Sequence, residues 1–450
     1  MTVLAPAGWW RGLAGLTRSG RASEGLAWSL YDFANTIFSY GVVSYAIGLW
    51  SVDRLGPGAG QFWLGVAAAV SVGLNAAVSP VLGAVSDRSG RRLPFLLFFT
   101  ALTILCTAAI ALVSTGDELP LLTVIGLGLF AVANFSYQAA LIYYDATLPE
   151  VARPGALGRM SGIGVAMGYL GTVLIAVLIL VLGSGSGPLT FAMVAVLFAV
   201  FAAPIFTSVR EPEGGGRFRL GEAARSWAQV ATTLRHAREV PGLLRFLVGR
   251  FFYTDPVNTA IVVMAVFATE AIGLTKSEAN LMLLLLTVVA VVASFLWGRA
   301  VEAWGPKRTL MVVLGSWCVG LVVVGTSLTV PAFVIGGVLL GSGLGGVWTS
   351  DRVYMLRLSP PGQVGEFFGL YGLVGKLSAV IGPLAYGIIV AALLGPIGRA
   401  AYQVAILSLL VLMVIGLVII RRVPSGKPAA AGVVAHPVEP AIVPPGETPA

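Results

Sequence analysis

Residues 83–92 read Gly-Ala-Val-Ser-Asp-Arg-Ser-Gly-Arg-Arg, a charge-dense stretch between two long apolar runs. A weaker copy recurs later in the chain, and both of its glycines follow their counterparts by 215 residues (298 − 83 and 305 − 90). The matching residues of the copy are Gly298, Glu302, Gly305, Lys307 and Arg308. Because the chain has few charges, two matched stretches indicate two homologous halves.

The composition is that of a membrane protein. The 450 residues are 57% hydrophobic and 11% charged, whereas about 25% of the residues of a soluble domain are charged. A bilayer-spanning helix needs about 20 mostly apolar residues. We therefore predict an all-α membrane protein with twelve transmembrane helices in two pseudo-symmetric six-helix bundles. The predicted helices are 26–50, 62–84, 94–114, 120–143, 160–183, 189–208, 243–269, 277–299, 309–328, 331–354, 366–392 and 400–420.

Lysine and arginine residues concentrate in alternate loops between these helices and near both termini. By the positive-inside rule, both termini are expected in the cytoplasm, and the expected location is the bacterial cell (inner) membrane. The linker is expected to contain an amphipathic helix over 222–238. The predicted domains are a cytoplasmic lead at 1–25, bundles at 26–208 and 243–422, a cytoplasmic linker at 209–242 and a disordered cytoplasmic tail at 423–450.

Soluble-enzyme chemistry and nucleic-acid binding find little support. The net charge of +8 lies in alternate loops rather than on one face, so we expect no nucleic-acid partner. The two histidines, His236 and His436, lie in the predicted linker and tail. No nucleophile, phosphate-binding or metal-ligand spacing is found, so we predict no cofactor, no metal and no enzymatic activity.

The most informative intramembrane signal is a repeated pentad. Residues 32–36 and 255–259 share Asp, Asn and Thr at the first, fourth and fifth positions, which places these side chains on one helical face. An ionisable residue at a helix centre costs about 3 kcal/mol on insertion scales. We expect the two faces to confront each other and bind substrate or a coupling ion; the alternative is that they brace helices. The predicted site residues here are Asp32, Asn35, Asp255 and Asn258. Pro256 is expected to break its helix locally.

Lys376 is the lysine that lies inside a predicted membrane helix. A buried ammonium calls for a counter-charge, and the candidates are Asp32, Asp255 and Asp351. Such a cation could hold a substrate carboxylate, and a purely structural ion pair is an equal alternative.

Further polar residues lie in the fourth, seventh and tenth predicted helices. Tyr137 and Gln138 are expected to orient a substrate by hydrogen bonds. Arg250, Arg352 and Asp145 lie nearer the predicted cytoplasmic interface, where long side chains can reach water, so no role in the site is predicted for them.

The charged stretch is predicted to form a gate on the cytoplasmic side. Asp87 is expected to bind the positive N-terminal end of the eleventh helix and so hold the two bundles together, while neighbouring arginines engage carboxylates and phosphates. The predicted gate residues are Gly83, Asp87, Arg88, Gly90, Arg91 and Arg92 in the first half, and Glu302, Gly305 and Arg308 in the second.

This stretch resembles the signature between helices 2 and 3 of the major facilitator superfamily. Residues 31–35, 148–150 and 366–371 further resemble the family related to fungal vacuolar amino-acid effluxers. The resemblance implies nested repeats and alternating access around a central site, the geometry for which this superfamily is itself a standard illustration.

We therefore expect a secondary transporter of a small polar solute, most of all amino acids, with protons as a candidate coupling ion and the lipid bilayer as surroundings. One alternative is a proton-coupled exporter of hydrophobic compounds, which would not need Lys376. Another is a non-transporting membrane sensor or scaffold, which would not need two matched polar faces.

Overall fold

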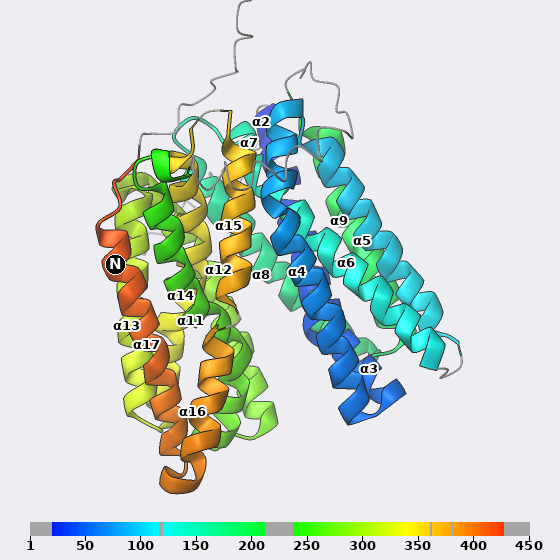
Figure 1. Ribbon diagram of the computed structural model, residues 1–450, viewed down its shortest axis with the longest axis vertical. Helices are drawn as coiled ribbons and strands as arrows, with labels where there is room; N and C mark the ends of the chain where they lie inside the picture. Colours follow the sequence, from blue (N-terminus) through cyan, green and yellow to red (C-terminus); the bar gives the residue numbers. More distant parts are fainter. Residues whose placement is uncertain (1–19, 117–119, 212–236, 361, 380, 427–450) are drawn as a thin grey trace, which may run out of the picture.

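The computed structural model describes residues 20–116, 120–211, 237–360, 362–379 and 381–426. Within these ranges every regular element is a helix, and Figure 1 shows two bundles side by side. The N-terminal bundle comprises α2 (Gly20–Phe38), the π-helical η2 (Ser39–Ala46), α3 (Ile47–Leu55), α4 (Pro57–Ser89), α5 (Leu93–Ser114), α6 (Pro120–Ala146), α7 (Leu148–Val151), α8 (Leu157–Leu182) and α9 (Pro188–Ser208). The C-terminal bundle comprises α11 (Leu243–Val266), the π-helical η3 (Phe267–Ile272), α12 (Lys276–Trp304), α13 (Pro306–Thr326), α14 (Val330–Leu358), α15 (Val364–Ser378), α16 (Ile381–Ile397) and α17 (Ala400–Arg421).

The predicted helices are present, with some changed ends. Eleven helices of the described chain are long and apolar enough to cross a membrane. The remaining predicted crossing is the continuous run from α2 through η2 to α3, which contains the polar residues Asp32 and Asn35. The predicted helix at 366–392 is divided into α15 and α16. The predicted local break at Pro256 is wrong, because α11 continues through this residue.

The chain ends differ in part from the prediction. Residues 423–426, predicted to be disordered, pack on the C-terminal bundle, where the Tyr354 hydroxyl donates to the Pro424 carbonyl at 2.6 Å. Most of the lead, most of the linker with its predicted amphipathic helix, and the rest of the tail lie outside the described residues.

Each charged stretch contains a glycine that ends its helix. Gly90 ends α4 with φ of 63°, and Gly305 ends α12 with φ of 83°. These positive φ angles are readily available only to glycine. The predicted turn is therefore shorter than the whole stretch: α4 continues to Ser89, so Asp87 lies on a helix.

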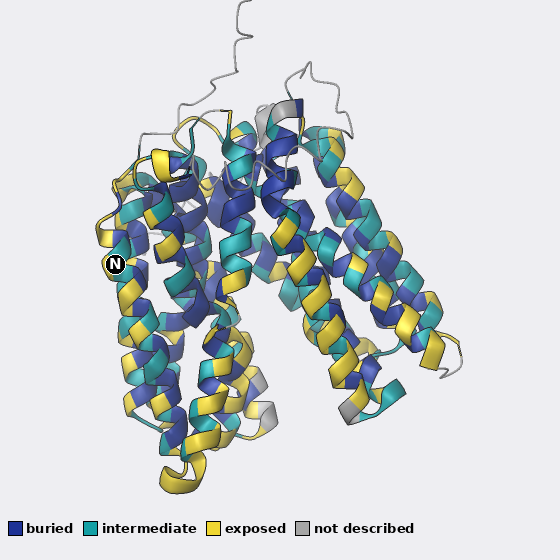
Figure 2. Cartoon of the chain, in the orientation of Figure 1, coloured by how far each residue is buried: buried dark blue, intermediate teal, exposed yellow. Residues whose placement is uncertain are grey.

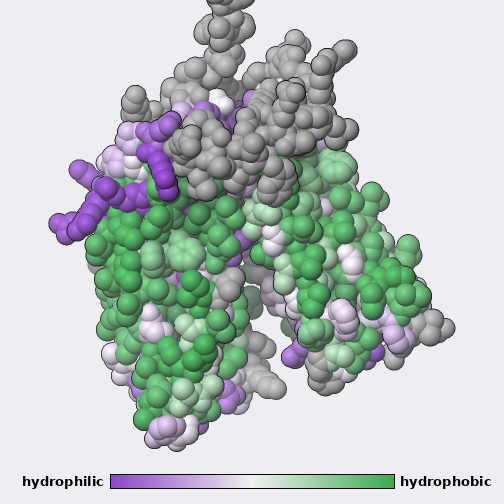
Figure 3. Space-filling model, in the orientation of Figure 1, coloured by the Kyte–Doolittle hydropathy of each residue, from purple (hydrophilic) through white to green (hydrophobic). Residues whose placement is uncertain are grey.

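The two bundles meet at one end and separate at the other. Contacts between them join α4 to α15, α8 to α12 and α14, and α6 to α15. Figure 1 shows the bundles converging where α7 lies, and the space-filling view in Figure 3 shows a notch between them at the opposite end. We call the converging end the closed side and the opposite end the open side.

Burial follows this arrangement. In Figure 2 buried residues concentrate inside each bundle and where the bundles converge, while exposed residues cover the outer faces and the open side. The core is rich in fully buried aromatic side chains, such as Trp28, Tyr144, Tyr253 and Trp317.

Candidate functional site

The expected contact of Asp87 with the other bundle is present on the closed side. Its Oδ1 accepts from the backbone N–H of Gly365 at 2.8 Å, and its Oδ2 accepts from that of Glu366 at 2.7 Å. Both donors lie in the first turn of α15, the positive end of the helix dipole. Gly83 brings the backbones together, since a Cβ built on it would lie 2.0 Å from the Gly365 oxygen.

A second contact of the same kind joins α8 of the N-terminal bundle to α12 of the C-terminal bundle. The Glu302 carboxylate accepts from the backbone N–H of Arg159 at 3.1 Å and pairs with the guanidinium of the same residue. Glu302 is the counterpart of Asp87 in the sequence repeat, and Arg159 lies in the first turn of α8. Here too glycines touch, because a Cβ on Gly158 would lie 2.6 Å from the Gly298 oxygen.

We predict that Asp87→Asn weakens the closed side. A charge-assisted hydrogen bond contributes about 1.5–3 kcal/mol, and the amide keeps only one acceptor oxygen, so the closed population should fall roughly tenfold. Ser161 of α8 is buried, and its hydroxyl donates to the Thr349 carbonyl of α14 across the interface. A cysteine at this position reports closure in a background lacking Cys106 and Cys318. Unchanged labelling of this cysteine in Asp87→Asn would rule out the latch.

Arg92 ties the charged stretch to neighbouring elements of its own half. Its guanidinium lies 2.5 Å from the Glu150 carboxylate and 3.5 Å from that of Asp87. Glu211, at the start of the linker, accepts from the backbone N–H groups of Arg92 and Leu93. Burial raises the pKa of Glu150 to about 7, although the Arg92 guanidinium acts in the opposite direction. The pair therefore weakens as the pH falls below neutrality.

Three other predicted gate residues are arginines for which no contact across the closed side is described. The Arg91 side chain is exposed, and so is that of Arg308. The side chain of Arg88 lies outside the described part of the structure.

A charged cluster lies between the bundles. Arg352 of α14 has its Nε 3.1 Å from Asp145 of α6 and its Nη2 3.9 Å from Asp32 of α2. Its guanidinium also lies 5.5 Å from the Trp28 ring and 5.6 Å from the Tyr144 ring, distances at which cation–π attraction acts. An arginine of one half is thus held by two carboxylates and two aromatic rings of the other.

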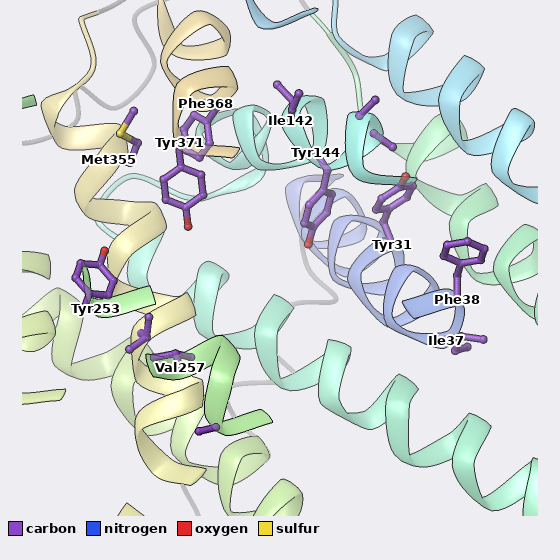
Figure 4. Packing of buried hydrophobic residues seen from close by; sticks show 14 of the residues in the cluster. Tyr31, Ile37, Phe38, Ile142, Tyr144, Tyr253, Val257, Met355, Phe368 and Tyr371 are labelled. Atoms are coloured by element: carbon purple, nitrogen blue, oxygen red, sulfur yellow. The ribbon is translucent and has the colours of Figure 1, made fainter. Parts of the chain in front are cut away.

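A second ion pair continues the cluster inside the C-terminal half. Arg250 Nε lies 3.4 Å from Asp351, and its guanidinium lies 3.5 Å from the centre of the Tyr371 ring. The Tyr371 hydroxyl donates to Asp351 Oδ1 at 2.9 Å, and the Tyr253 hydroxyl donates to Oδ2 at 3.4 Å. Figure 4 shows Tyr253 and Tyr371 in one half, and Tyr144 of the other half across from them.

We call these five residues the central cluster: Asp32, Asp145, Arg250, Asp351 and Arg352. They supply three carboxylates and two guanidinium groups, so with every group ionised the cluster carries one negative charge in excess. Inside a membrane protein such an excess favours a bound proton or cation.

The two Asp-Asn-Thr faces do not confront each other as predicted. The Thr36 hydroxyl donates to the Gly168 carbonyl of α8 at 2.5 Å, so the first face packs on α8. Asp255 Oδ1 accepts from the backbone N–H of Gly382 at 2.8 Å, so the second face packs on α16. The two faces do not meet because each packs on a helix of its own half: α2 on α8, and α11 on α16.

Lys376 does not meet a carboxylate within the described residues, contrary to the prediction. Its Nζ lies 3.4 Å from Ser79 Oγ, across the interface between the halves. The Ser79 hydroxyl in turn donates to Asn75 on the same helix, at 2.6 Å to the carbonyl and 2.8 Å to Oδ1. The three expected partners are turned elsewhere: Asp32 to Arg352, Asp351 to Arg250, and Asp255 to Gly382.

The remaining predicted site residues form no ion pair with the central cluster in the described structure. Asn35 is buried and its Oδ1 has no hydrogen-bond partner among the described residues. Tyr137 is half-buried, with its ring centroid 5.1 Å from that of Phe38. Gln138 and Asn258 are half-buried.

Comparison with known proteins identifies a family. The family model described as "Vacuole effluxer Atg22 like" matches residues 64–158 and 156–431. The chain belongs to this Atg22-like family. It is 28% identical over 419 residues to an uncharacterized MFS-type transporter, YxiO, of Bacillus subtilis, covering 88% of this chain and 94% of the relative. It is 25% identical over 297 residues to autophagy-related protein 22 of Cryptococcus neoformans, covering 59% of this chain and 50% of the fungal protein.

Solved structures of the major facilitator superfamily have the same fold. A bacterial homologue of the iron transporter ferroportin in an outward-facing state matches with a TM-score of 0.70 and 16% identity, covering 90% of this chain and 98% of that one. The proton:xylose symporter XylE matches with a TM-score of 0.66 and 14% identity, covering 92% and 98%. Together with the family match, this shows that the Atg22-like chain is a multi-pass integral membrane transporter, and the predicted fold class is confirmed.

Sequence reasoning missed most of the central cluster. Asp145, Arg250 and Arg352 were placed near water because they stand close to predicted helix ends. In the Atg22-like structure α14 continues to Leu358, and Arg250 and Arg352 are 3% and 8% exposed. The available signal was the presence of both charge signs inside apolar helices of different halves.

Proposed function

We propose that the chain carries amino acids by alternating access. The observation that supports this is Lys376, an ammonium at the interface of the halves whose hydrogen-bond partner is the neutral Ser79 hydroxyl. An amino acid needs a cationic partner for its carboxylate and an anionic one for its ammonium. Lys376 can bind the carboxylate. Asp32 can bind the ammonium, because its pairing with Arg352 is loose, at 3.9 Å. Asn35, Tyr137, Gln138, Asp255 and Asn258 remain proposed contributors.

The orientation belongs to the same proposal. The basic residues Arg91, Arg92, Lys307 and Arg308 all lie at the closed side, which the positive-inside rule assigns to the cytoplasm. The structure is then open to the outside, with both termini in the cytoplasm and the cell membrane as its location. Labelling of cysteines at the open-side residues Asp53 and Arg399 in whole cells with an impermeant reagent checks this orientation.

Lys376→Met should weaken binding of a neutral amino acid about tenfold to a hundredfold, because a charge-assisted contact worth about 1.5–3 kcal/mol is lost. Lys376→Arg keeps the charge and should lose less. The measurement is binding of the amino acid and of its amide, which lacks the carboxylate, to wild type and both variants in detergent.

The amide provides the decisive comparison. Wild type should prefer the acid to the amide, and Lys376→Met should not. If both proteins treat acid and amide alike, Lys376 has a structural role and the amino-acid proposal loses its main support. Substrate-dependent flux of a hydrophobic compound but no amino acid in liposomes would favour the exporter alternative; no flux at all would favour the scaffold.

Proton coupling is proposed from the excess carboxylate of the central cluster. Protonation of Asp32 or Asp145 would release Arg352 and loosen the contact between the halves. We expect Asp32→Asn to abolish uptake driven by a pH gradient. Because Asp32 is also the proposed partner of the substrate ammonium, substrate exchange should remain measurable only at higher substrate concentration. Uptake by this variant that still follows the imposed gradient would remove Asp32 from the coupling mechanism.

A further inference from the structure

The closed-side end of the C-terminal bundle carries a group of basic side chains on three adjacent helices. Lys307, in the first turn of α13, donates from Nζ to the Arg421 carbonyl at 3.0 Å. Arg245 of α11 donates from Nη1 to the Arg422 carbonyl at 3.0 Å. Both contacts are to backbone oxygens at the end of α17, so the cationic groups gather around one helix end. We call Arg245, Lys307, Arg421 and Arg422 the basic end cluster.

No ion pair joins this cluster to a carboxylate among the described residues. The equivalent position of the N-terminal half is different. Arg92, the counterpart of Lys307 (92 + 215), forms ion pairs with Asp87 and Glu150. The positive-inside rule accounts for basic residues at both positions. The rule does not explain why the basic residue of the N-terminal half is paired with carboxylates while the basic end cluster of the C-terminal half has no carboxylate partner among the described residues.

The surface beside the basic end cluster is apolar and faces outward. Val248 stands one turn from Arg245 on α11, and Val418 stands one turn from Arg421 on α17; they are 43% and 47% exposed. Trp304, three residues before Lys307, is 52% exposed, and tryptophan is typical of the membrane interface. Figure 3 shows a hydrophilic patch at this end of the C-terminal half, bordered by hydrophobic surface.

We propose that the basic end cluster binds the headgroup phosphate of an anionic phospholipid, with the acyl chains lying along Val248 and Val418. Positive charges just outside an apolar, outward-facing surface are complementary to a lipid that carries a phosphate above its chains. A free phosphate would use the charges but not the apolar surface, which is why the lipid is the chosen ligand. The site strengthens attachment of the α11–α13–α17 face to the cytoplasmic leaflet.

The test compares two double variants in detergent. Arg245→Gln with Lys307→Gln removes two charges of the cluster and keeps side chains able to donate hydrogen bonds. Arg91→Gln with Arg210→Gln removes two exposed charges of the N-terminal half. Thermal stability is followed while phosphatidylglycerol or phosphatidylcholine is added. Wild type and the second variant should be stabilised by phosphatidylglycerol in preference to phosphatidylcholine. In the first variant the phosphatidylglycerol concentration at half-effect should rise about thirtyfold, at about 1 kcal/mol per charge.

Three results would overturn the proposal: equal losses in both double variants, no preference of wild type for phosphatidylglycerol, or equal stabilisation by inorganic phosphate. The first would indicate general surface charge, and the last a site for a soluble anion. If the first double variant does not fold, native mass spectrometry of Lys307→Gln serves instead. The Lys307→Gln variant should retain fewer bound phosphatidylglycerol molecules than wild type, and an unchanged number would contradict the proposed lipid site.

Discussion

Replacing Arg352 with methionine should abolish transport and destabilise the protein more than any other single change considered. Arg352 balances Asp145 at 3.1 Å and Asp32 at 3.9 Å. Removing one partner of a buried ion pair costs about 3–5 kcal/mol because the remaining charge is left uncompensated. We expect a lower unfolding temperature and greater labelling of the Ser161→Cys reporter, because the two halves lose their central ionic contact.

A compensating substitution distinguishes charge from packing. Arg352→Met together with Asp145→Asn removes a charge of each sign and should recover much of the lost stability. Arg357→Met on the same helix is a matched control, since Arg357 forms no ion pair in the described structure. If the double variant is no more stable than Arg352→Met, the cost does not come from unpaired carboxylates.

Gly83→Ala should prevent the closed side from forming. The added methyl would lie 2.0 Å from the Gly365 oxygen and 2.6 Å from its carbonyl carbon, and these backbone atoms cannot rotate away as a side chain can. Overpacking costs about 1–3 kcal/mol, which alone shifts a two-state population roughly fivefold to more than a hundredfold. We expect loss of transport and strong labelling of Ser161→Cys.

The same helix provides the control for this variant. Gly73 also lies on α4, but a methyl built there meets nothing within 4 Å. Gly73→Ala should therefore keep transport and wild-type labelling. Were Gly83→Ala to label and transport like Gly73→Ala, close packing at residue 83 could not be what holds the bundles together.

The helices and one latch were predictable from the sequence for physical reasons. Long apolar runs specify membrane helices almost independently of tertiary contacts, and the acidic residue of a charged turn needs a positive partner, which a helix N-terminus provides. Asp87 therefore lies where expected. The partners of Arg352 and Lys376 depend on how helices of different halves pack, and neither hydrophobic period nor spacing specifies that packing. The same limit explains why the two Asp-Asn-Thr faces were wrongly expected to meet.

The glycine contacts between the halves determine how gradually they can part. At Gly83 and Gly158 the backbone of one half lies directly against a backbone carbonyl of the other half. Dispersion attraction loses a quarter to a half of its strength over a gap of about 0.5–1 Å. The first ångström of movement therefore forfeits up to about half of the attraction at these backbone contacts. We expect parting to be all-or-none, and single-molecule distances across the closed side should show two populations and no partly separated one. An all-or-none separation of the halves shortens the time during which the cavity could be open to both sides of the membrane and leak ions.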